Sequence, residues 1–299
     1  MRRSIVIIVA FVFALAGCVL TRPEAPQIKQ ISINGTKLTY QEQGQGRPIV
    51  FVHGAITDHR VWEGQREAVA ARNRFIALTM RYFGTEPWPD AGANYSVQTH
   101  TDDLVAFLTN LNAGPVDLVG WSYSGPIALL VAVQRPELVR SLFLDEPSTL
   151  ALVTDQAEFK VATQDRTAMA APGAFAVKAG DIAGAVKNLF NGVNGQPDIF
   201  DTVPPEVRTM LLDNARTLPP SFAAPPPPAI TCEQLGRIKV PTTVAVGELT
   251  RPFYKIAAGA VARCIPGAKL VVIAQGRHAA PVQATSAFNE ALLRFLTEK

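Results

Sequence analysis

Short runs of apolar residues alternate along this chain with longer segments in which apolar residues recur at helical spacing. Four of these runs carry almost no polar residue: LVG at 118–120, LFL at 142–144, VAV at 244–246 and LVVI at 270–273. Continuous apolar runs of this length are typical of strands that are buried on both faces of a parallel sheet. The alternation therefore predicts an α/β fold, in which helices cover a mostly parallel sheet.

Eight segments have the composition of strands, which is enough for one open sheet. They are residues 31–34, 37–43, 48–52, 75–79, 116–119, 141–144, 242–246 and 269–273. The first two flank Asn34-Gly35, a pair typical of a two-residue turn, so we expect them to form an antiparallel hairpin. Periodic apolar residues predict helices over 101–111, 124–134 and 286–296.

A long insertion separates the sixth expected strand from the seventh. Residues 147–237 contain helical patterns over 155–170, 174–189 and 205–218, followed by the proline run 225–228, which is expected to be a stiff, extended linker. Because the chain returns to the sheet afterwards, we interpret this insertion as a helical lid and not as a separate domain.

The N-terminal segment has the features of an export signal. Arg2 and Arg3 precede an uncharged apolar stretch over 5–16, which is shorter than the roughly 20 residues that span a bilayer. The residues Leu-Ala-Gly-Cys at 15–18 resemble the lipobox of bacterial lipoproteins. This resemblance implies that residues 1–17 are removed and that Cys18 is acylated, which would anchor the protein to a membrane of the cell envelope, facing the periplasm or the exterior.

Two alternatives to lipidation remain at this point, namely an ordinary signal peptide and a permanent transmembrane helix. In the lipoprotein interpretation, residues 18–30 form a tether and residues 31–299 form the folded domain. Export also permits a disulfide between Cys232 and Cys264, although two unpaired cysteines are equally compatible with the sequence.

Charge and ligand spacing exclude other classes of protein. The net charge of +3 comes from 28 basic and 25 acidic residues that are scattered along the chain, without the basic clusters of a nucleic-acid-binding protein. No histidine or cysteine partner stands at metal-ligand spacing, so we expect no metal site.

The segment VDLVGWSYSGPIALL places Ser122 between a buried strand and an apolar helix. It resembles the nucleophile elbow G-x-S-x-G of the α/β-hydrolase family. A sharp strand-to-helix turn needs small residues two positions before and after the nucleophile. Gly120 and Ser124 satisfy this need, although the second glycine of the pattern stands one position late, at Gly125.

The resemblance to the α/β-hydrolase family extends from about residue 31 to the C-terminus. It implies an eight-stranded, mostly parallel sheet with a helical lid after the sixth strand. In this family the triad runs in the order serine, acid, histidine, and His278 is the one histidine that follows Ser122. The phrase His53-Gly54-Ala55 resembles the H-G loop, so the backbone N–H groups of Ala55 and Tyr123 are expected to form the oxyanion hole.

The triad acid departs from the commonest family pattern. Most members carry an aspartate after the seventh strand, where this chain has Thr250. Some relatives place the acid after the sixth strand, and Glu146 matches that position, so we predict Glu146 as the acid. Glu248 and Asp145 remain as alternatives.

The resemblance implies a serine hydrolase that needs no cofactor and acts on a small acyl substrate. Relatives with an aspartate nucleophile, such as epoxide hydrolases and haloalkane dehalogenases, are excluded by Ser122. We expect hydrolysis of a carboxylic ester, thioester or lactone through an acyl-enzyme on Ser122. The alternatives are C–C bond hydrolysis, a cofactor-free haloperoxidase activity, and a non-catalytic binding module of the envelope.

Overall fold

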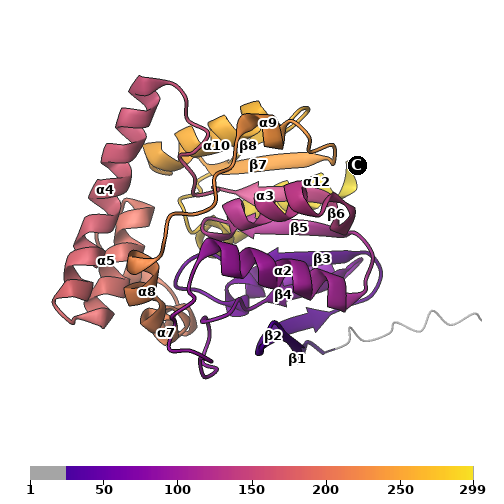
Figure 1. Ribbon diagram of the computed structural model, residues 1–299, viewed down its shortest axis with the longest axis horizontal. Coiled ribbons are helices and arrows are strands. Elements are labelled where there is room, and N and C mark those ends of the chain that lie inside the picture. Colours follow the sequence, from indigo (N-terminus) through magenta and orange to yellow (C-terminus); the bar gives the residue numbers. More distant parts are fainter. Residues whose placement is uncertain (1–24, 299) are drawn as a thin grey trace, which may run out of the picture.

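The computed structural model describes residues 25–298 and contains one eight-stranded sheet with the strand order β1-β2-β4-β3-β5-β6-β7-β8 (Figure 1). The strands are β1 (Gln27–Ile33), β2 (Thr36–Gln43), β3 (Pro48–Val52), β4 (Arg74–Leu78), β5 (Val116–Trp121), β6 (Val139–Asp145), β7 (Thr242–Gly247) and β8 (Lys269–Ile273). All eight predicted strands are present, and the predicted α/β-hydrolase architecture is confirmed.

The sheet is parallel except around β2. Strand β2 pairs antiparallel with both β1 and β4, whereas β3 to β8 pair in parallel. Asn34 and Gly35 both adopt positive φ, at 43° and 73°, as a tight turn between β1 and β2 requires. Because the six parallel strands share one direction, their carboxyl ends meet at a single edge of the sheet.

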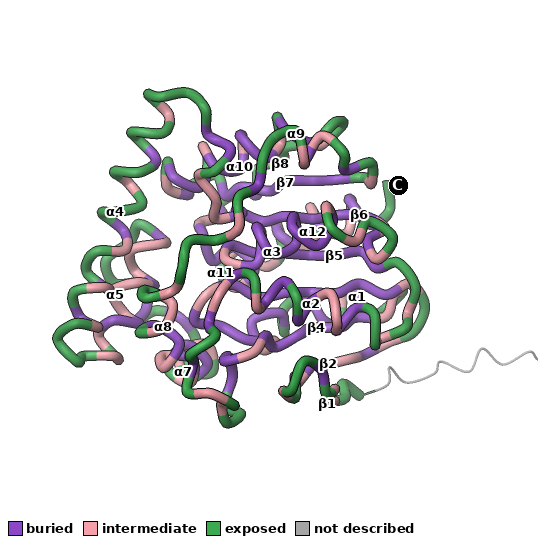
Figure 2. The backbone as a smooth tube through the Cα atoms, in the orientation of Figure 1, coloured by how far each residue is buried: buried purple, intermediate pink, exposed green. Residues whose placement is uncertain are grey.

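Helices cover both faces of the sheet. One face carries α2 (Val97–Leu111), α3 (Ser124–Gln134) and α10 (Pro252–Cys264), and the other carries α1 (Glu63–Ala70), α11 (Ala280–Gln283) and α12 (Thr285–Thr297). Short 3₁₀ turns, η1 (His59–Trp62) and η2 (Pro136–Leu138), join helices to strands. Figure 2 shows that buried residues concentrate on the central strands and on α3, which packs against β5 and β6 beside α2. Burial of apolar surface on both faces explains why the central strands have no polar alternation.

The insertion after β6 is helical, as predicted, and most of it gathers at one end of the sheet, whereas its last helix, Cys232–Leu235, packs against α10 and α3 (Figure 1). It comprises α4 (Gln156–Lys178), α5 (Ile182–Asn194), α6 (Ile199–Thr202), α7 (Pro205–Asp213), η3 (Ala215–Thr217), α8 (Leu218–Ala223) and α9 (Cys232–Leu235). The predicted helix end near 170 was wrong, because α4 continues through Pro172. A proline removes one hydrogen bond from a helix interior. Close packing against α5 offsets this loss: the two helices lie so near each other that a Cβ at Gly173, the next residue, would be 3.3 Å from the Ala185 carbonyl.

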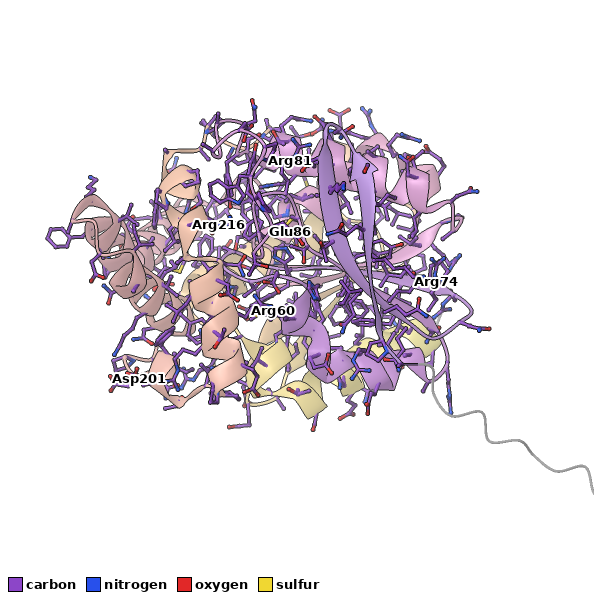
Figure 3. All side chains as sticks on the ribbon, turned by 90° about the horizontal axis from the view of Figure 1, so that it is seen from below. Arg60, Arg74, Arg81, Glu86, Asp201 and Arg216 are labelled. Atoms are coloured by element: carbon purple, nitrogen blue, oxygen red, sulfur yellow. A yellow bond between two sulfur atoms is a disulfide. The ribbon has the colours of Figure 1, made fainter. Side chains whose placement is uncertain are left out.

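Polar contacts attach the lid to the rest of the domain (Figure 3). Arg60 forms ion pairs with Asp58 and, at 2.8 Å, with Asp213 at the end of α7. Arg216 donates to the Gly84 carbonyl at 2.8 Å and lies over the ring of Trp88. These contacts join η3 and α7 to the loops that follow β3 and β4.

The N-terminal boundary differs from the prediction. Strand β1 begins at Gln27, so residues 27–30, which the sequence analysis assigned to the tether, pair with β2. These residues lie on an edge strand, where polar side chains face solvent and the apolar pattern is weak. The predicted signal peptide, Cys18 and the start of the tether lie outside the described residues. Within residues 25–298, helices are too short or too polar to qualify as candidates for a membrane span.

Cys232 and Cys264 form a disulfide, with their Cα atoms 4.8 Å apart. This bond resolves the alternatives left open by the sequence. It joins α9, the last element of the insertion, to the end of α10, which packs beside β7.

Candidate active site

Ser122 lies in a sharp turn between β5 and α3, with φ of +55°. A positive φ is unfavourable for a residue with a side chain, and it is held here by close packing on both sides. A Cβ at Gly120 would lie 3.2 Å from the Ser124 carbonyl, and one at Gly125 would lie 2.5 Å from the Cβ of Pro147. Position 125 therefore requires a glycine, because the segment that follows β6 passes directly over the start of α3.

Ser124, which replaces the usual second glycine, also has a structural role. Its hydroxyl donates to the Val52 carbonyl of β3 at 2.7 Å and accepts from the Trp121 N–H at 2.9 Å. The side chain is fully buried. A small hydroxyl residue thus fits the elbow and links β5 to β3.

His278 lies in the loop after β8 and contacts Ser122. Its Nε2 is 2.8 Å from the Ser122 Oγ, and its Nδ1 is 2.6 Å from the Glu146 Oε2. All three residues are buried, with exposed fractions of 6% or less. A carboxylate only accepts hydrogen bonds, so Nδ1 carries the proton and Nε2 accepts from the serine hydroxyl. This arrangement lets the imidazole take the serine proton.

Glu146 is held by the residues that surround the position of the missing aspartate. Its Oε1 accepts from the Gly247 N–H at 2.8 Å, and its Oε2 accepts from the Thr250 hydroxyl at 3.0 Å. Thr250 therefore donates to the carboxylate that was predicted to replace the usual aspartate. Glu146 also has positive φ, at 47°, which turns its side chain from the end of β6 toward the histidine.

The two alternative acids do not contact His278. Glu248 is exposed and accepts hydrogen bonds from the backbone and side chain of Gln275. Asp145 is fully buried, and neither of its carboxyl oxygens has a hydrogen-bond partner within the described chain. Burial raises the pKa of Asp145 well above its usual value, and the charge of Glu146 raises it further, so the protonated form is favoured.

Aromatic side chains on either side fix the plane of the His278 ring. Tyr254 of α10 stacks on it with ring centroids 3.8 Å apart and an interplanar angle of 13°. Trp121 lies 5.5 Å from it and donates its indole N–H to the His278 carbonyl at 2.9 Å. The imidazole is thus restrained by stacking as well as by its hydrogen bonds.

The backbone N–H groups of Ala55 and Tyr123 donate no hydrogen bond within residues 25–298, and both residues line the cavity beside Ser122. Two free amides beside a nucleophile are what an oxyanion hole requires. His53 supports their loop: its Nε2 accepts from the Met80 N–H at 3.0 Å, and its Nδ1 donates to the Gly54 carbonyl at 2.8 Å. Burial lowers the pKa of His53 to about 4, which keeps it neutral.

The cavity beside Ser122 has a volume of about 210 Å³. Most of its walls are apolar, and the lid supplies a large share of them through Leu189, Phe190, Val193 and Leu211. Asn194 also lines it, but its side chain is used internally, because it accepts from the Ala279 N–H at 2.9 Å. The cavity therefore suits a small apolar group next to the serine hydroxyl.

Sequence reasoning missed several residues that surround the nucleophile. The Ser148 hydroxyl lies 3.3 Å from the Ser122 Oγ, and Ser148 lines the same cavity. Ser148 follows Glu146 by two residues, which was a usable signal. Tyr254 and Arg166, which also line the cavity, come from helices whose local sequence gives no such signal. His100 is buried and bonds to the Tyr123 hydroxyl at 2.8 Å, behind the cavity wall.

The sequence profile of the alpha/beta hydrolase family matches residues 49–291. Among curated proteins, the chain is 34% identical over 124 residues to a 2-hydroxymuconate semialdehyde hydrolase of Pseudomonas sp. (strain CF600), a match that covers 40% of this chain and 44% of that protein. It is 30% identical over 128 residues to a 2-hydroxy-6-oxo-2,4-heptadienoate hydrolase of Pseudomonas putida, covering 42% and 46%. The matches thus span less than half the length of these relatives.

Solved structures match over nearly the whole chain. A structure of Est816, described as an N-acyl homoserine lactone degrading enzyme, superposes with a TM-score of 0.72 at 26% identity and covers 89% of this chain and all of that chain. A bromoperoxidase from Bacillus anthracis superposes with a TM-score of 0.74 at 22% identity, covering 91% of this chain and all of that chain. The latter likeness concerns the fold alone.

Proposed function

The chain belongs to the alpha/beta hydrolase family, and on this premise we propose that it hydrolyses a small carboxylic ester through an acyl-enzyme on Ser122. The observation that carries the proposal is the continuous hydrogen-bond chain from Ser122 through His278 to Glu146, with distances of 2.8 and 2.6 Å. A hydroxyl, a base and an orienting carboxylate in this order are the elements of nucleophilic acyl transfer.

The reaction begins when the Ser122 Oγ attacks the ester carbonyl and its proton passes to the His278 Nε2. Glu146 stabilises the imidazolium that forms, and the N–H groups of Ala55 and Tyr123 bind the oxyanion. The imidazolium then protonates the leaving alcohol, which leaves an acyl group on the serine. Water attacks this acyl group after losing a proton to the same imidazole, and the acid product leaves.

Lactone hydrolysis is a second candidate, because Est816, at 26% identity, is described as a lactone-degrading enzyme. The two reactions share every step up to the acyl-enzyme. They differ in the leaving alcohol, which stays attached to the acyl group when a lactone opens.

A fluorophosphonate probe tests the proposal, since it reacts with activated serines. We expect the full chain to be labelled and the Ser122→Ala variant to remain unlabelled. A panel of 4-nitrophenyl esters of increasing acyl length, together with simple lactones, then separates the two candidates. Labelling that persists in the Ser122→Ala variant would reject Ser122 as the reactive serine, and absence of labelling from the wild type would favour a non-catalytic binding protein.

A further inference from the structure

We propose that the cavity beside Ser122 receives a substrate with an anionic group, which the guanidinium of Arg166 binds at the cavity mouth. This inference rests on the proposed function and specifies its substrate class. The substrate is a small acyl compound with an apolar body and a negatively charged end, such as a carboxylate.

Arg166 is the one charged residue among the described side chains that line the cavity, apart from the catalytic imidazole, and no aspartate or glutamate lines it. Its neighbours in the wall, including Leu189 and Val193, are apolar. Charges interact more strongly beside apolar walls than in water. An anionic group is therefore attracted to this cavity, whereas a cationic group meets an unopposed positive charge.

Within residues 25–298, the Arg166 guanidinium forms no ion pair and no hydrogen bond, and the residue is exposed to solvent. The residues one turn away on α4, at positions 162, 163, 169 and 170, are Ala, Thr, Met and Ala, so its own helix offers no acidic partner. Other lid arginines are engaged: Arg208 donates to the Val203 carbonyl at 3.3 Å, and Arg216 donates to the Gly84 carbonyl at 2.8 Å.

Asp165, the acidic residue next to Arg166 in the sequence, already has other hydrogen-bond partners. Asp165 accepts from the Arg251 Nε at 3.2 Å and from the Phe253 N–H at 3.1 Å. This contact fixes α4 to the start of α10, which also carries Tyr254 at the cavity. The next residue along α4, Arg166, is consequently held at the cavity mouth with its charge uncompensated.

The size of the cavity limits the apolar part of the substrate. At about 210 Å³, it lies below the roughly 300–1,000 Å³ of pockets that enclose drug-sized ligands. A short chain or a single ring next to the reacting carbonyl fits this space, and the charged end then lies at the mouth. Arginine suits this role because its planar guanidinium donates two parallel hydrogen bonds to one carboxylate.

Two pairs of isosteric esters test the inference with the full chain. The first pair, 4-acetoxybenzoate and 4-acetoxybenzamide, places the charge on the leaving group. The second pair, the 4-nitrophenyl monoester of adipate and that of its monoamide, places the charge on the acyl group. We expect the carboxylate of at least one pair to have a kcat/KM about tenfold higher than its amide, mainly through KM. This preference should shrink as ionic strength rises, because the group lies at an exposed mouth.

Variants then assign the preference to one side chain. In Arg166→Gln the ratio of carboxylate to amide is expected to fall to near one, and in Arg166→Glu it is expected to invert. Lys160→Gln, which removes a charge from the same helix at a position that does not line the cavity, should keep the wild-type ratio. Hydrolysis without any charge preference, or a preference that survives in Arg166→Gln, overturns this inference alone. Absence of hydrolysis together with absence of Ser122 labelling overturns the proposed function as well.

Discussion

Replacing Glu146 by glutamine should nearly abolish turnover without unfolding the protein. The carboxylate has two distinct oxygens: Oε1 accepts from the Gly247 N–H at 2.8 Å, and Oε2 faces both the Thr250 hydroxyl and the His278 Nδ1. The new amide must keep its oxygen toward the Gly247 N–H, so its NH₂ group faces the imidazole. That group can only donate, which forces Nδ1 to lose its proton and Nε2 to carry one.

An imidazole in this tautomer cannot accept the proton of Ser122. The corresponding loss of an aspartate charge in serine proteases lowers kcat by about 10⁴-fold, equivalent to about 5.5 kcal/mol of transition-state stabilisation. We expect a loss of about 10³- to 10⁴-fold in kcat/KM for the most active ester of the panel, with KM nearly unchanged. Steady-state kinetics measures the loss, and thermal unfolding verifies that the variant is folded.

Two further variants sharpen this test. Glu248→Gln is the matched control, because the Glu248 carboxylate is exposed, bonds to Gln275 and should tolerate the same change with full activity. Adding Thr250→Asp to Glu146→Gln places a carboxylate at the position of most family members' aspartate, beside the side chain of residue 146, and should recover at least about tenfold of the lost activity. Activity in Glu146→Gln within tenfold of wild type, or equal losses in both glutamine variants, would refute the assignment of the acid.

Three other changes have definite expectations. Tyr254→Leu removes the ring stacked on His278 and should lower kcat about tenfold and displace the pH–rate profile, whereas Tyr254→Phe keeps the stacking and most of the activity. Asp145→Asn should be more stable than wild type at neutral pH, and the two stabilities should converge near pH 4. Because the pKa of Asp145 is raised in the folded protein, the free energy of unfolding of the wild type falls as pH rises above the usual pKa of 3.8. Denaturant unfolding at several pH values measures this difference. Replacing Cys232 and Cys264 by serine should lower the free energy of unfolding by about 3–4 kcal/mol, the chain-entropy value for a loop of 32 residues, as judged by chemical denaturation against the oxidised wild type.

The sheet and the strand-to-helix turn at Ser122 were predictable because their signals are local. Helix α3 has the predicted bounds, Ser124–Gln134, since a run of apolar residues between a buried strand and Arg135 leaves few alternatives. His278 could be identified by its order in the chain. The ends of elements were less predictable, as β1 and α4 illustrate, because pairing with β2 and packing on α5 extend them beyond the local pattern.

The supporting residues of the site were not predictable for a different physical reason. Tyr254, Ser148 and Arg166 reach the cavity from α10, the loop after β6 and α4. Their roles depend on how distant elements pack, and no spacing in the sequence encodes that packing. Thr250 is instructive in this respect: the sequence marked it as an unsuitable acid, and the structure shows that it donates to the carboxylate at 3.0 Å.

The direction of β1 has a consequence for access. Strand β1 runs antiparallel to β2, which runs antiparallel to β4, so β1 starts at the edge of the sheet opposite the lid (Figure 1). Eight residues lie between Cys18 and Gln27, and the nine Cα–Cα steps from one to the other span at most about 32 Å. A lipid attached to Cys18 would thus place the attachment point at the end of the sheet opposite the lid. Under that proposal, the cavity would lie at the end of the domain remote from the tether, where dissolved compounds reach it more readily than the acyl chains of the membrane do.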